Sequence, residues 1–330
     1  MKNIVIFGAT GETGMYLTDY LYENLDAEEF QVIAVGRRKT TFFDRYPISY
    51  VSMDISEEKE FDKLPTEDIY AVIFLAGIMP GRMEGYDPIQ YIDVNVKGLF
   101  NVLEYSRKNG VEKILYTQTI RDIGNLIGKE VLRADTARDF SYKGDHAVYV
   151  ISKNAAVDLI EHYHQEYGIK NYIFRLPTIY LYSPNEYYYV DGVKRIMGFR
   201  HLINQAIKGE KIEIWGDPER AHDVVYVKDL CQVFLNAIVL DGETGVYNIG
   251  TGIPVSLREQ IEGIIKVFSP AKKRSDIVFC PEKTNARDYR IDISKTIRNL
   301  QYSPKYDYLS YLYDFKEEME KNRFNDLSGE

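Results

Sequence analysis

The stretch Ile4-Val5-Ile6-Phe7-Gly8-Ala9-Thr10-Gly11-Glu12-Thr13-Gly14 decides the fold. Its first four residues form a short apolar run, which is typical of a strand buried within a parallel sheet. The three glycines come directly before a helical pattern of apolar residues that begins at Met15. Such a turn lets the backbone approach a pyrophosphate, and the helix N-terminus adds N–H groups and positive potential. The stretch therefore predicts a nucleotide-binding unit, with a mere glycine turn as the alternative.

The chain continues as strands separated by helices up to Arg175. Further strands are predicted at Gln31–Val35, Ile48–Met53, Ala71–Ala76, Lys113–Tyr116 and Tyr172–Arg175, and the clearest helices at 92–109 and 147–167. Strands that alternate with helices imply right-handed crossovers and a parallel sheet. The predicted fold class is therefore α/β, with a doubly wound parallel sheet of the Rossmann type.

The pattern changes after Pro177, where the segments become shorter and richer in turns and tyrosines. We predict a nucleotide-binding Rossmann domain over residues 1–177 and a smaller C-terminal α/β domain over residues 178–330. The segment from about 223 to 250 is expected to return to the first domain. No internal repeat or low-complexity linker is visible.

Composition excludes several classes of protein. The 330 residues contain 41 Lys and Arg against 50 Asp and Glu, a net charge of −9 that disfavours nucleic-acid binding. Two cysteines, Cys231 and Cys280, cannot build a disulfide framework or a four-cysteine zinc site, and no metal is expected. The longest apolar run, Ala71 to Pro80, is about half a membrane span. A cytoplasmic protein with no membrane partner is therefore expected.

The end of the second predicted strand indicates which nicotinamide cofactor is bound. NAD enzymes place an acid there for the ribose 2′-hydroxyl, whereas this chain reads Gly36-Arg37-Arg38. Two guanidinium groups suit a 2′-phosphate, which favours NADP(H) over NAD(H). The alternative is a solvated basic loop. Asp54 follows the third strand, where it would accept from the adenine amino group or cap a helix.

Tyr149 and Lys153 are the predicted catalytic pair. They are four residues apart, so they share one face of a helix, and no other Tyr-x3-Lys pair occurs among the 28 tyrosines. A tyrosine with a pKa of ~10 is a poor base at pH 7, but a nearby ammonium favours the phenolate. Thr119, just after the fifth strand, would bind the substrate oxygen or merely cap the strand end.

Taken together, the chain resembles extended short-chain dehydrogenases/reductases of the NAD(P)-dependent epimerase/dehydratase family, which act mostly on nucleotide-diphosphate sugars. The resemblance covers nearly all residues. Besides the glycine stretch and the Tyr/Lys pair, it rests on Phe74-Leu75-Ala76-Gly77, Asn95-Val96-Lys97-Gly98, Arg175-Leu176-Pro177, Gly216-Asp217, the stretch from His222 to Asp229, Tyr247-Asn248-Ile249-Gly250 and Asp292-Ile293-Ser294-Lys295.

The resemblance implies a set of roles. Thr119, Tyr149 and Lys153 become the catalytic triad, and segments 90–109 and 148–167 become the contact of a homodimer. Residues 1–177 become the NADP-binding domain, and residues 178–330 become the substrate-binding domain. The expected cofactor contacts are Gly8, Thr10, Gly11, Glu12, Thr13, Gly14, Arg37, Arg38, Asp54, Ile55, Leu75, Ala76, Gly77, Asn95, Thr117, Tyr149, Lys153 and Pro177. The expected substrate contacts are Met79, Thr119, Arg220, His222 and Arg287.

Three departures from the family pattern stand out. Gly36-Arg37 replaces the usual acid. His222 stands where an arginine commonly faces the substrate diphosphate, although Arg220 and Arg287 are possible substitutes. The segment from Arg121 to Gly144 lacks the usual Val-Tyr-Gly after the catalytic hydroxyl, which leaves the shape of the sugar pocket open.

These features predict an NADP(H)-dependent oxidoreductase/epimerase that acts on a nucleotide-diphosphate sugar. Alternatives are an NADPH-dependent reductase of a non-nucleotide carbonyl compound and a sugar-nucleotide dehydratase. A non-catalytic NADP sensor is disfavoured, because it would need no Tyr/Lys pair. The family's dehydratases follow the catalytic hydroxyl with an Asp-Glu pair, but here Ile120 and Arg121 follow, and Asp122 comes one position late. Dehydration is therefore not expected unless Glu130 or Asp135 supplies the missing groups.

Overall fold

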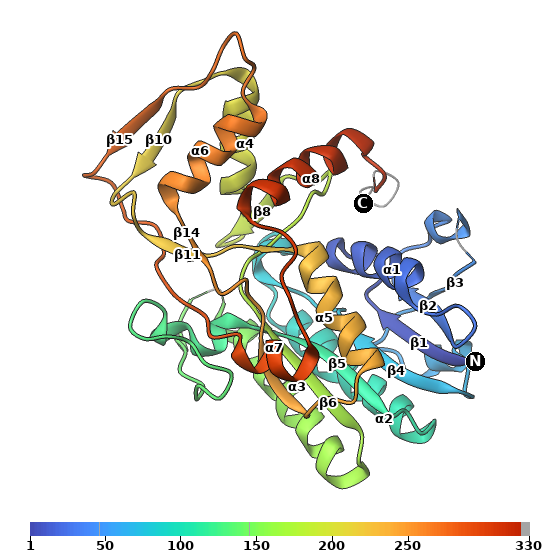
Figure 1. The fold of residues 1–330 in the computed structure, drawn as a ribbon. Coiled ribbons are helices and arrows are strands. Elements are labelled where there is room, and N and C mark those ends of the chain that lie inside the picture. The colour runs from blue at the N-terminus through green and yellow to red at the C-terminus, as the bar shows by residue number, and fades with distance from the viewer. Residues whose placement is uncertain (46, 145, 325–330) are drawn as a thin grey trace.

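A seven-stranded parallel sheet forms the centre of the computed structural model, which describes residues 1–45, 47–144 and 146–324 (Figure 1). Residues 325–330 of the predicted C-terminal domain lie outside the described residues. The strand order is β13-β6-β5-β4-β1-β2-β3, and every neighbouring pair is parallel. The strands are β1 (Lys2–Phe7), β2 (Phe30–Gly36), β3 (Ser49–Ser52), β4 (Ile69–Phe74), β5 (Lys113–Thr119), β6 (Lys170–Leu176) and β13 (Gly245–Asn248). The predicted doubly wound α/β class is confirmed.

Helices cover both faces of the sheet. Alternate residues of β1 therefore pack in two different hydrophobic cores, one on each face. Ile4 and Ile6 pack in one core with helices α1 (Glu12–Asn24), α5 (Val227–Val239) and α7 (Ser294–Leu300). Val5 and Phe7 pack in the other core with α2 (Leu99–Lys108) and α3 (Ala147–Tyr167). Side chains of a strand alternate between faces, so a strand buried on both sides must be apolar throughout, as the first apolar run is.

The helix bounds agree with the expected ones at α3, which ends at Tyr167 and is capped by Gly168 in the left-handed region, with a φ of 75°. The helix expected from residue 92 begins differently, because Tyr91–Gly98 forms a π-helical segment, η4, that leads into α2. Gly98 lies against Ile55, where a Cβ atom would come within 2.8 Å of that side chain. The glycine therefore allows the helix to approach the loop after β3.

The remaining elements gather beyond the carboxyl ends of the central strands (Figure 1). They are β7 (Ile179–Tyr180), β8 (Tyr187–Val190), β9 (Val193–Ile196), α4 (Gly198–Lys208), β10 (Ile212–Trp215), β11 (Ala221–Asp223), β12 (Val225–Tyr226), β14 (Pro254–Ser256), α6 (Leu257–Phe268), β15 (Ile277–Cys280) and α8 (Tyr308–Lys321). Between β12 and β14 the chain returns to the sheet as α5 and β13, and β13 pairs with β6.

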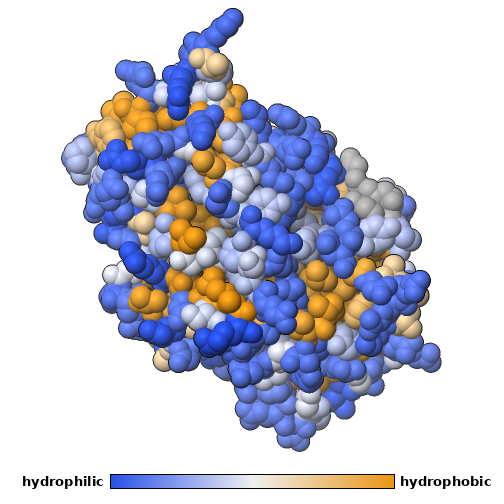
Figure 2. Space-filling model, in the orientation of Figure 1, coloured by the Kyte–Doolittle hydropathy of each residue, from blue (hydrophilic) through white to orange (hydrophobic). Residues whose placement is uncertain are grey.

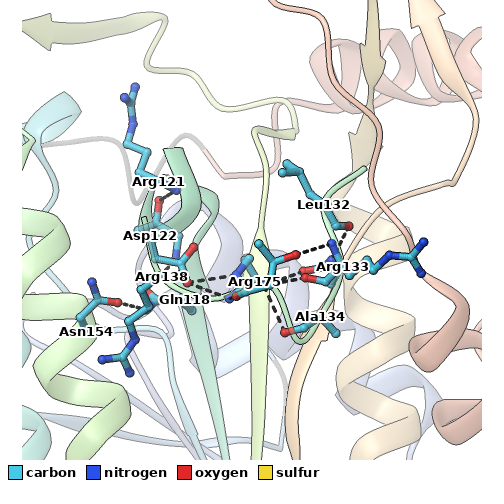
Figure 3. Close-up of polar contacts among 12 residues, drawn as sticks. Gln118, Arg121, Asp122, Leu132, Arg133, Ala134, Arg138, Asn154 and Arg175 are labelled. Carbon is cyan, nitrogen blue, oxygen red and sulfur yellow. Dashed lines mark hydrogen bonds and ion pairs between the residues drawn. The ribbon is translucent and has the colours of Figure 1, made fainter. Parts of the chain in front are cut away.

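The unusual segment after β5 is organised around Arg175 at the end of β6 (Figure 3). The segment starts as the short helix η5 (Ile120–Leu126), which carries Asp122, and the side chains of Asp122 and Arg175 form an ion pair. The same guanidinium donates to the carbonyl oxygens of Arg133 at 3.1 Å and Ala134 at 3.3 Å. The buried Arg175 side chain thus contacts this segment at two places, at Asp122 and at Arg133 and Ala134. These contacts connect a segment with little regular structure to the sheet.

Hydrophilic residues cover most of the face seen in Figure 2, with hydrophobic residues exposed in patches between them. Over the described ranges, no helix has both the length and the apolar composition that crossing a bilayer requires. Within the same residues, no group of three or more His, Cys, Asp or Glu side chains could hold a metal ion.

Candidate active site and dinucleotide groove

The glycine turn lies at the switch point of the sheet, where β1 has β2 on one side and β4 on the other. Gly8 has a φ of 93°, and a Cβ atom there would lie 2.6 Å from the backbone nitrogen of Ala76. A Cβ atom at Gly14 would lie 2.1 Å from the carbonyl oxygen of Gly8. Gly11 caps α1 without a side-chain hydrogen bond, so the helix N-terminus keeps N–H groups for a ligand. The turn thus has the geometry that a pyrophosphate requires.

A cavity of about 220 Å³ extends from this turn across the ends of β2 and β3. Ten of the predicted cofactor contacts line it: Gly8, Thr10, Gly11, Arg37, Arg38, Asp54, Ile55, Leu75, Ala76 and Gly77. Both arginine side chains are exposed, as expected for groups that would meet a phosphate at the rim. The structure therefore brings together the residues predicted for the adenosine half of a dinucleotide.

Gly36 ends β2 and Asp54 follows β3, where contacts with the adenosine were expected, and the surroundings of the two residues differ. A Cβ atom at Gly36 would lie 2.6 Å from the Thr10 hydroxyl, so an acidic side chain does not fit at this position without a shift. Asp54 accepts hydrogen bonds from Ser56, from the backbone N–H at 2.9 Å and the hydroxyl at 2.7 Å. Burial alone would raise the pKa of Asp54, but these bonds and the charge of Arg37 hold it below its ordinary value. Asp54 lines the cavity and caps a turn at once.

A second cavity, of about 400 Å³, contains the predicted reacting groups. Thr119 at the end of β5 and Tyr149 and Lys153 on α3 all line it. The other predicted contacts on its wall are Glu12, Thr13, Leu75, Ala76, Gly77, Met79, Thr117, Pro177 and Arg287. Leu75, Ala76 and Gly77 line both cavities, so one groove runs from the glycine turn to Tyr149.

Burial governs the electrostatics of the Tyr/Lys pair. It raises the pKa of Tyr149 to about 12, against the opposing effects of a hydrogen bond with Thr119 and the positive charge of Arg121. It lowers the pKa of Lys153 to about 7. The Lys153 ammonium lies 4.1 Å from the ring centroid of Tyr116, a cation–π contact that partly replaces water. A bound ligand that carries negative charge would favour the ammonium form and, through it, the phenolate.

Asn95 lines neither cavity, although it was predicted as a cofactor contact. Its side chain is buried and pairs with both backbone groups of Ile78, at 2.8 and 3.0 Å. It also donates to the Ser152 hydroxyl at 3.0 Å, and this hydroxyl donates to the Tyr149 carbonyl at 2.7 Å. Asn95 therefore ties the loop after β4 to the helix that carries Tyr149.

The substrate contacts expected beyond Pro177 are only partly brought together. Arg287 lines the cavity, but Arg220 and His222 do not. The His222 ring lies against Tyr289, 5.5 Å between centroids, and burial lowers the pKa of His222. Its Nδ1 atom has no hydrogen-bond partner in the described part of the chain.

Sequence reasoning missed Arg200, which lines the cavity from α4. Its side chain is 6% exposed and donates to the Ser183 carbonyl at 3.1 Å, while its Nε finds no partner among the described residues. A signal was available, because Arg200, Ile203 and Ala206 stand at helical spacing and form the buried face of α4. A basic residue on an apolar face indicates a buried ligand or ion pair.

Another missed contact joins the glycine turn to the hairpin of β8 and β9. Arg82, on the short helix η3 (Pro80–Arg82), forms an ion pair with Glu12 and donates to the Tyr187 carbonyl at 2.8 Å. The Gly85 N–H donates to the Gly192 carbonyl at 3.3 Å. The hairpin is thus attached to the loop that borders both cavities.

The sheet, the glycine turn and the groove define a dinucleotide-binding protein of the Rossmann type. A model of the NAD dependent epimerase/dehydratase family matches residues 4–250, and the chain belongs to this family. The family resemblance inferred from the motifs is thereby confirmed. Its members include sugar-nucleotide enzymes of the extended short-chain dehydrogenase/reductase class, and the chain is an enzyme of this class with a nicotinamide dinucleotide site.

Several known proteins are similar over most of the chain. A putative UDP-glucose 4-epimerase of Methanocaldococcus jannaschii is 27% identical over 80% of this chain and 81% of its own. The crystal structure of a Thermotoga maritima UDP-glucose 4-epimerase with UDP-glucose has a TM-score of 0.76 at 23% identity, covering 97% and 99% of the two chains. A Bacillus cereus UDP-glucuronic acid 4-epimerase with UDP-glucuronic acid and NAD has a TM-score of 0.72 at 22% identity, covering 96% and 99%. At these identities the two crystal structures show the fold.

Proposed function

We propose that the protein is an NADP(H)-dependent oxidoreductase/epimerase that acts on a nucleotide-diphosphate sugar by hydride transfer at a sugar carbon. One observation carries the proposal. Thr119, Tyr149 and Lys153 line a single cavity that shares part of its wall with the dinucleotide groove. A substrate in this cavity would therefore meet both a hydroxyl acid–base group and the reactive end of a cofactor.

Preference for NADP(H) is supported by the adenosine half of the groove. When bound, a nicotinamide dinucleotide supplies a group that accepts and returns a hydride. Gly8 and Gly11 would hold its pyrophosphate, and Arg37 and Arg38 would pair with a 2′-phosphate. Gly14, which lines neither cavity, would instead let α1 pack closely against the turn. Close packing between Gly36 and Thr10 disfavours the acid that would select NAD(H). Neighbouring family structures contain NAD, so the choice of NADP(H) is the part of the proposal most open to a direct test.

The reacting groups would work as a relay of hydrogen bonds. Tyr149 would take the proton of the sugar hydroxyl as a hydride leaves the same carbon, and would return it in the reverse step. Thr119, hydrogen-bonded to Tyr149, would orient the substrate oxygen. Lys153 would stabilise the phenolate by charge. Arg200 and Arg287, which line the same cavity, would bind the diphosphate.

The alternative of a dehydratase receives no support from the acids near the cavity. Asp122 is buried in its ion pair with Arg175. Asp135 lines a separate cavity of about 610 Å³, and Glu130 is exposed and lines neither the groove nor the reaction cavity. Among the described residues, Glu12 is the only carboxylate on the reaction cavity, and it pairs with Arg82. A reductase or epimerase therefore fits the cavity better.

We also propose a cytoplasmic homodimer. Exposed apolar side chains on the two segments expected at the dimer contact, among them Ile92, Phe100, Ile151 and Tyr167, would be buried by a second copy. Sedimentation should give twice the 38.3 kDa chain mass. A monomer at micromolar concentration would contradict this arrangement.

The reaction is tested with purified enzyme, NADP+ or NADPH, and a panel of UDP-, GDP-, CDP- and dTDP-hexoses and hexuronates. Mass spectrometry and proton NMR follow the sugar. An unchanged mass with altered stereochemistry identifies an epimerase, and a change of two hydrogens identifies a redox enzyme. A product lighter by one water would contradict the proposal. Reduction of simple ketones with no activity on any sugar nucleotide would establish the alternative reductase.

A further inference from the structure

The last described residues of the chain pack against the nucleotide-binding part of the molecule. Phe324, three residues beyond the end of α8, is completely buried. The centroid of its ring lies 4.7 Å from that of Tyr16 on α1 and 5.9 Å from that of Phe42. Arg323, the preceding residue, forms an ion pair with Asp19 on α1. The chain beyond α8 is therefore anchored to α1, near which it ends in Figure 1.

A row of aromatic rings continues from Phe324 towards the turn after β2. Phe42 and Phe43 are neighbours in the connection between β2 and β3, and their ring centroids are 5.1 Å apart. Phe43 stacks on Tyr50 of β3, also at 5.1 Å. The Tyr50 hydroxyl donates to the Arg38 carbonyl oxygen, and Arg38 lines the adenosine half of the groove. Contacts thus run without interruption from the C-terminal segment to the proposed site of the 2′-phosphate.

Strand β3 holds the backbone of this turn through two hydroxyl groups. Burial raises the pKa of Tyr50 to about 12, so its hydroxyl remains a donor at neutral pH. A Cβ atom at Gly36 would lie 3.1 Å from the same hydroxyl, which shows how closely Tyr50 packs against the turn. Ser52 donates from its hydroxyl to the Arg37 carbonyl at 3.3 Å. The positions of both arginines therefore depend on where β3 and its aromatic neighbours lie.

We propose, on the basis of the NADP(H) preference proposed above, that Phe324 is a positioning residue for the 2′-phosphate site. Phe324 lines neither the groove nor the reaction cavity, so it would act only through its neighbours. Closely packed rings transmit a displacement, because little free volume separates them. Without the Phe324 ring, Phe42 and Phe43 lose a packing partner, Tyr50 is held less firmly, and Arg38 is less well oriented before the cofactor binds. NADH has no 2′-phosphate, so its binding does not use this arrangement.

The test is a fluorescence titration of NADPH and NADH with the wild type, Phe324→Ala, Phe324→Leu and the control Phe268→Ala. Phe268 is also buried, but its ring packs against Phe315 at 6.3 Å and lines neither cavity. Phe324→Ala should weaken NADPH binding by about 10-fold, part of the value of one charge-assisted hydrogen bond, and leave NADH binding nearly unchanged. Phe324→Leu keeps much of the apolar volume and should show the same change at about 2- to 3-fold. Phe268→Ala should leave the ratio of the two affinities unchanged.

A double-mutant cycle determines whether Phe324 acts through Arg38. In an Arg38→Ala background, Phe324→Ala should have little further effect on NADPH affinity, because the group that it positions is gone. If the two substitutions weaken NADPH binding additively, the inference is wrong. An equal loss of affinity for NADPH and NADH in Phe324→Ala would also overturn it, because that is the effect of a purely structural residue. If Phe324→Ala does not fold, the same comparisons are made with Phe324→Leu.

Hydrogen exchange without cofactor separates this inference from the proposed cofactor preference. In the connection between β2 and β3, the Asp44 N–H donates to the Thr41 carbonyl at 3.0 Å. This amide should exchange faster in Phe324→Ala than in the wild type, and at the wild-type rate in Phe268→Ala. If the wild type binds NADH as tightly as NADPH, the cofactor preference is wrong, but faster exchange still supports the positioning role of Phe324. Unchanged exchange in Phe324→Ala overturns that role.

Discussion

Arg175 and Asp122 form an ion pair in which both side chains are almost completely buried. The Nε and Nη2 atoms of Arg175 each lie 3.0 Å from Asp122 Oδ2, and the two side chains are 5% and 2% exposed. Burial raises the pKa of the Asp122 carboxyl, and the adjacent guanidinium opposes this rise. The pair connects the end of β6 to the segment that borders the reaction cavity, so stability and site geometry depend on the same contact.

Removing one partner of this pair should be costly. Asp122→Ala leaves the Arg175 charge buried without its carboxylate, and the free energy of unfolding should fall by about 3–5 kcal/mol. Urea denaturation measures the change. Asp158→Ala is the matched control, because its ion pair with Arg138 is exposed and should contribute less than ~1 kcal/mol. Similar losses in both variants would contradict the assignment of a structural role to the buried pair.

Tyr149→Phe removes a hydroxyl and leaves the ring in place. Turnover should fall by about 10²- to 10⁴-fold, since proton transfer is lost, while NADPH affinity should hardly change. Tyr142→Phe serves as the control, because Tyr142 is exposed and does not line the cavity. Single-turnover kinetics and fluorescence titration separate the two effects. A Tyr149→Phe enzyme with a near-normal rate would refute the proposed role.

Lys153 should make stability depend on pH. Burial lowers the pKa of its ammonium to about 7, whereas the unfolded chain holds this proton up to a pKa near 10.5. Between these values the unfolded state binds more protons, so the Lys153 contribution to stability increases as the pH rises from 7 to 10. Lys153→Met lacks this contribution. Denaturation at pH 7 and pH 9.5 measures the free energy of unfolding of both proteins. The value for the wild type minus the value for Lys153→Met should therefore be larger at pH 9.5 than at pH 7. If the difference is the same at both pH values, the pKa of Lys153 is not lowered in the folded state.

Cofactor choice should depend on Arg37 and Arg38. Replacing both with alanine should weaken NADPH binding by roughly 1.5–3 kcal/mol for each charged bond that is lost, with little effect on NADH. Lys39→Ala is the control, since Lys39 is exposed in the same loop and does not line the cavity. Titration of both cofactors measures the affinities. If the wild type binds NADH as tightly as NADPH, the preference for NADP(H) is wrong.

Local patterns in the sequence were sufficient to predict the structural elements that depend only on neighbouring residues. The glycine turn, the first six strands of the sheet in chain order and the bounds of α3 follow from apolar spacing and glycine positions, which act within a few residues. The seventh strand, β13, was expected only as part of a segment that returns to the first domain. The cavity that joins Thr119, Tyr149 and Lys153 was also expected, because strand ends and helix starts meet at one edge of a parallel sheet.

Long-range contacts were beyond such reasoning. Arg175 was recognised only as part of a motif, because its carbonyl partners lie about forty residues earlier in a segment without periodicity. Arg200 looks like any basic residue on a helix until the packing of α4 is known. The π-helical start at Tyr91 gave no signal either, since the apolar residues Ile92, Val96, Leu99, Val102 and Leu103 recur at the spacing of an α-helix.

The position of β13 has a consequence for how the chain is made. Residues 177–244 separate β6 from its neighbour β13, so the sheet cannot be completed until most of the polypeptide has left the ribosome. Until then β6 presents an unpaired edge, which is a template for pairing with other chains. Closing such a long connection also slows folding. Fragments that end near Pro177 should therefore aggregate during expression, and the nascent chain should benefit from chaperones until residue 248 has emerged.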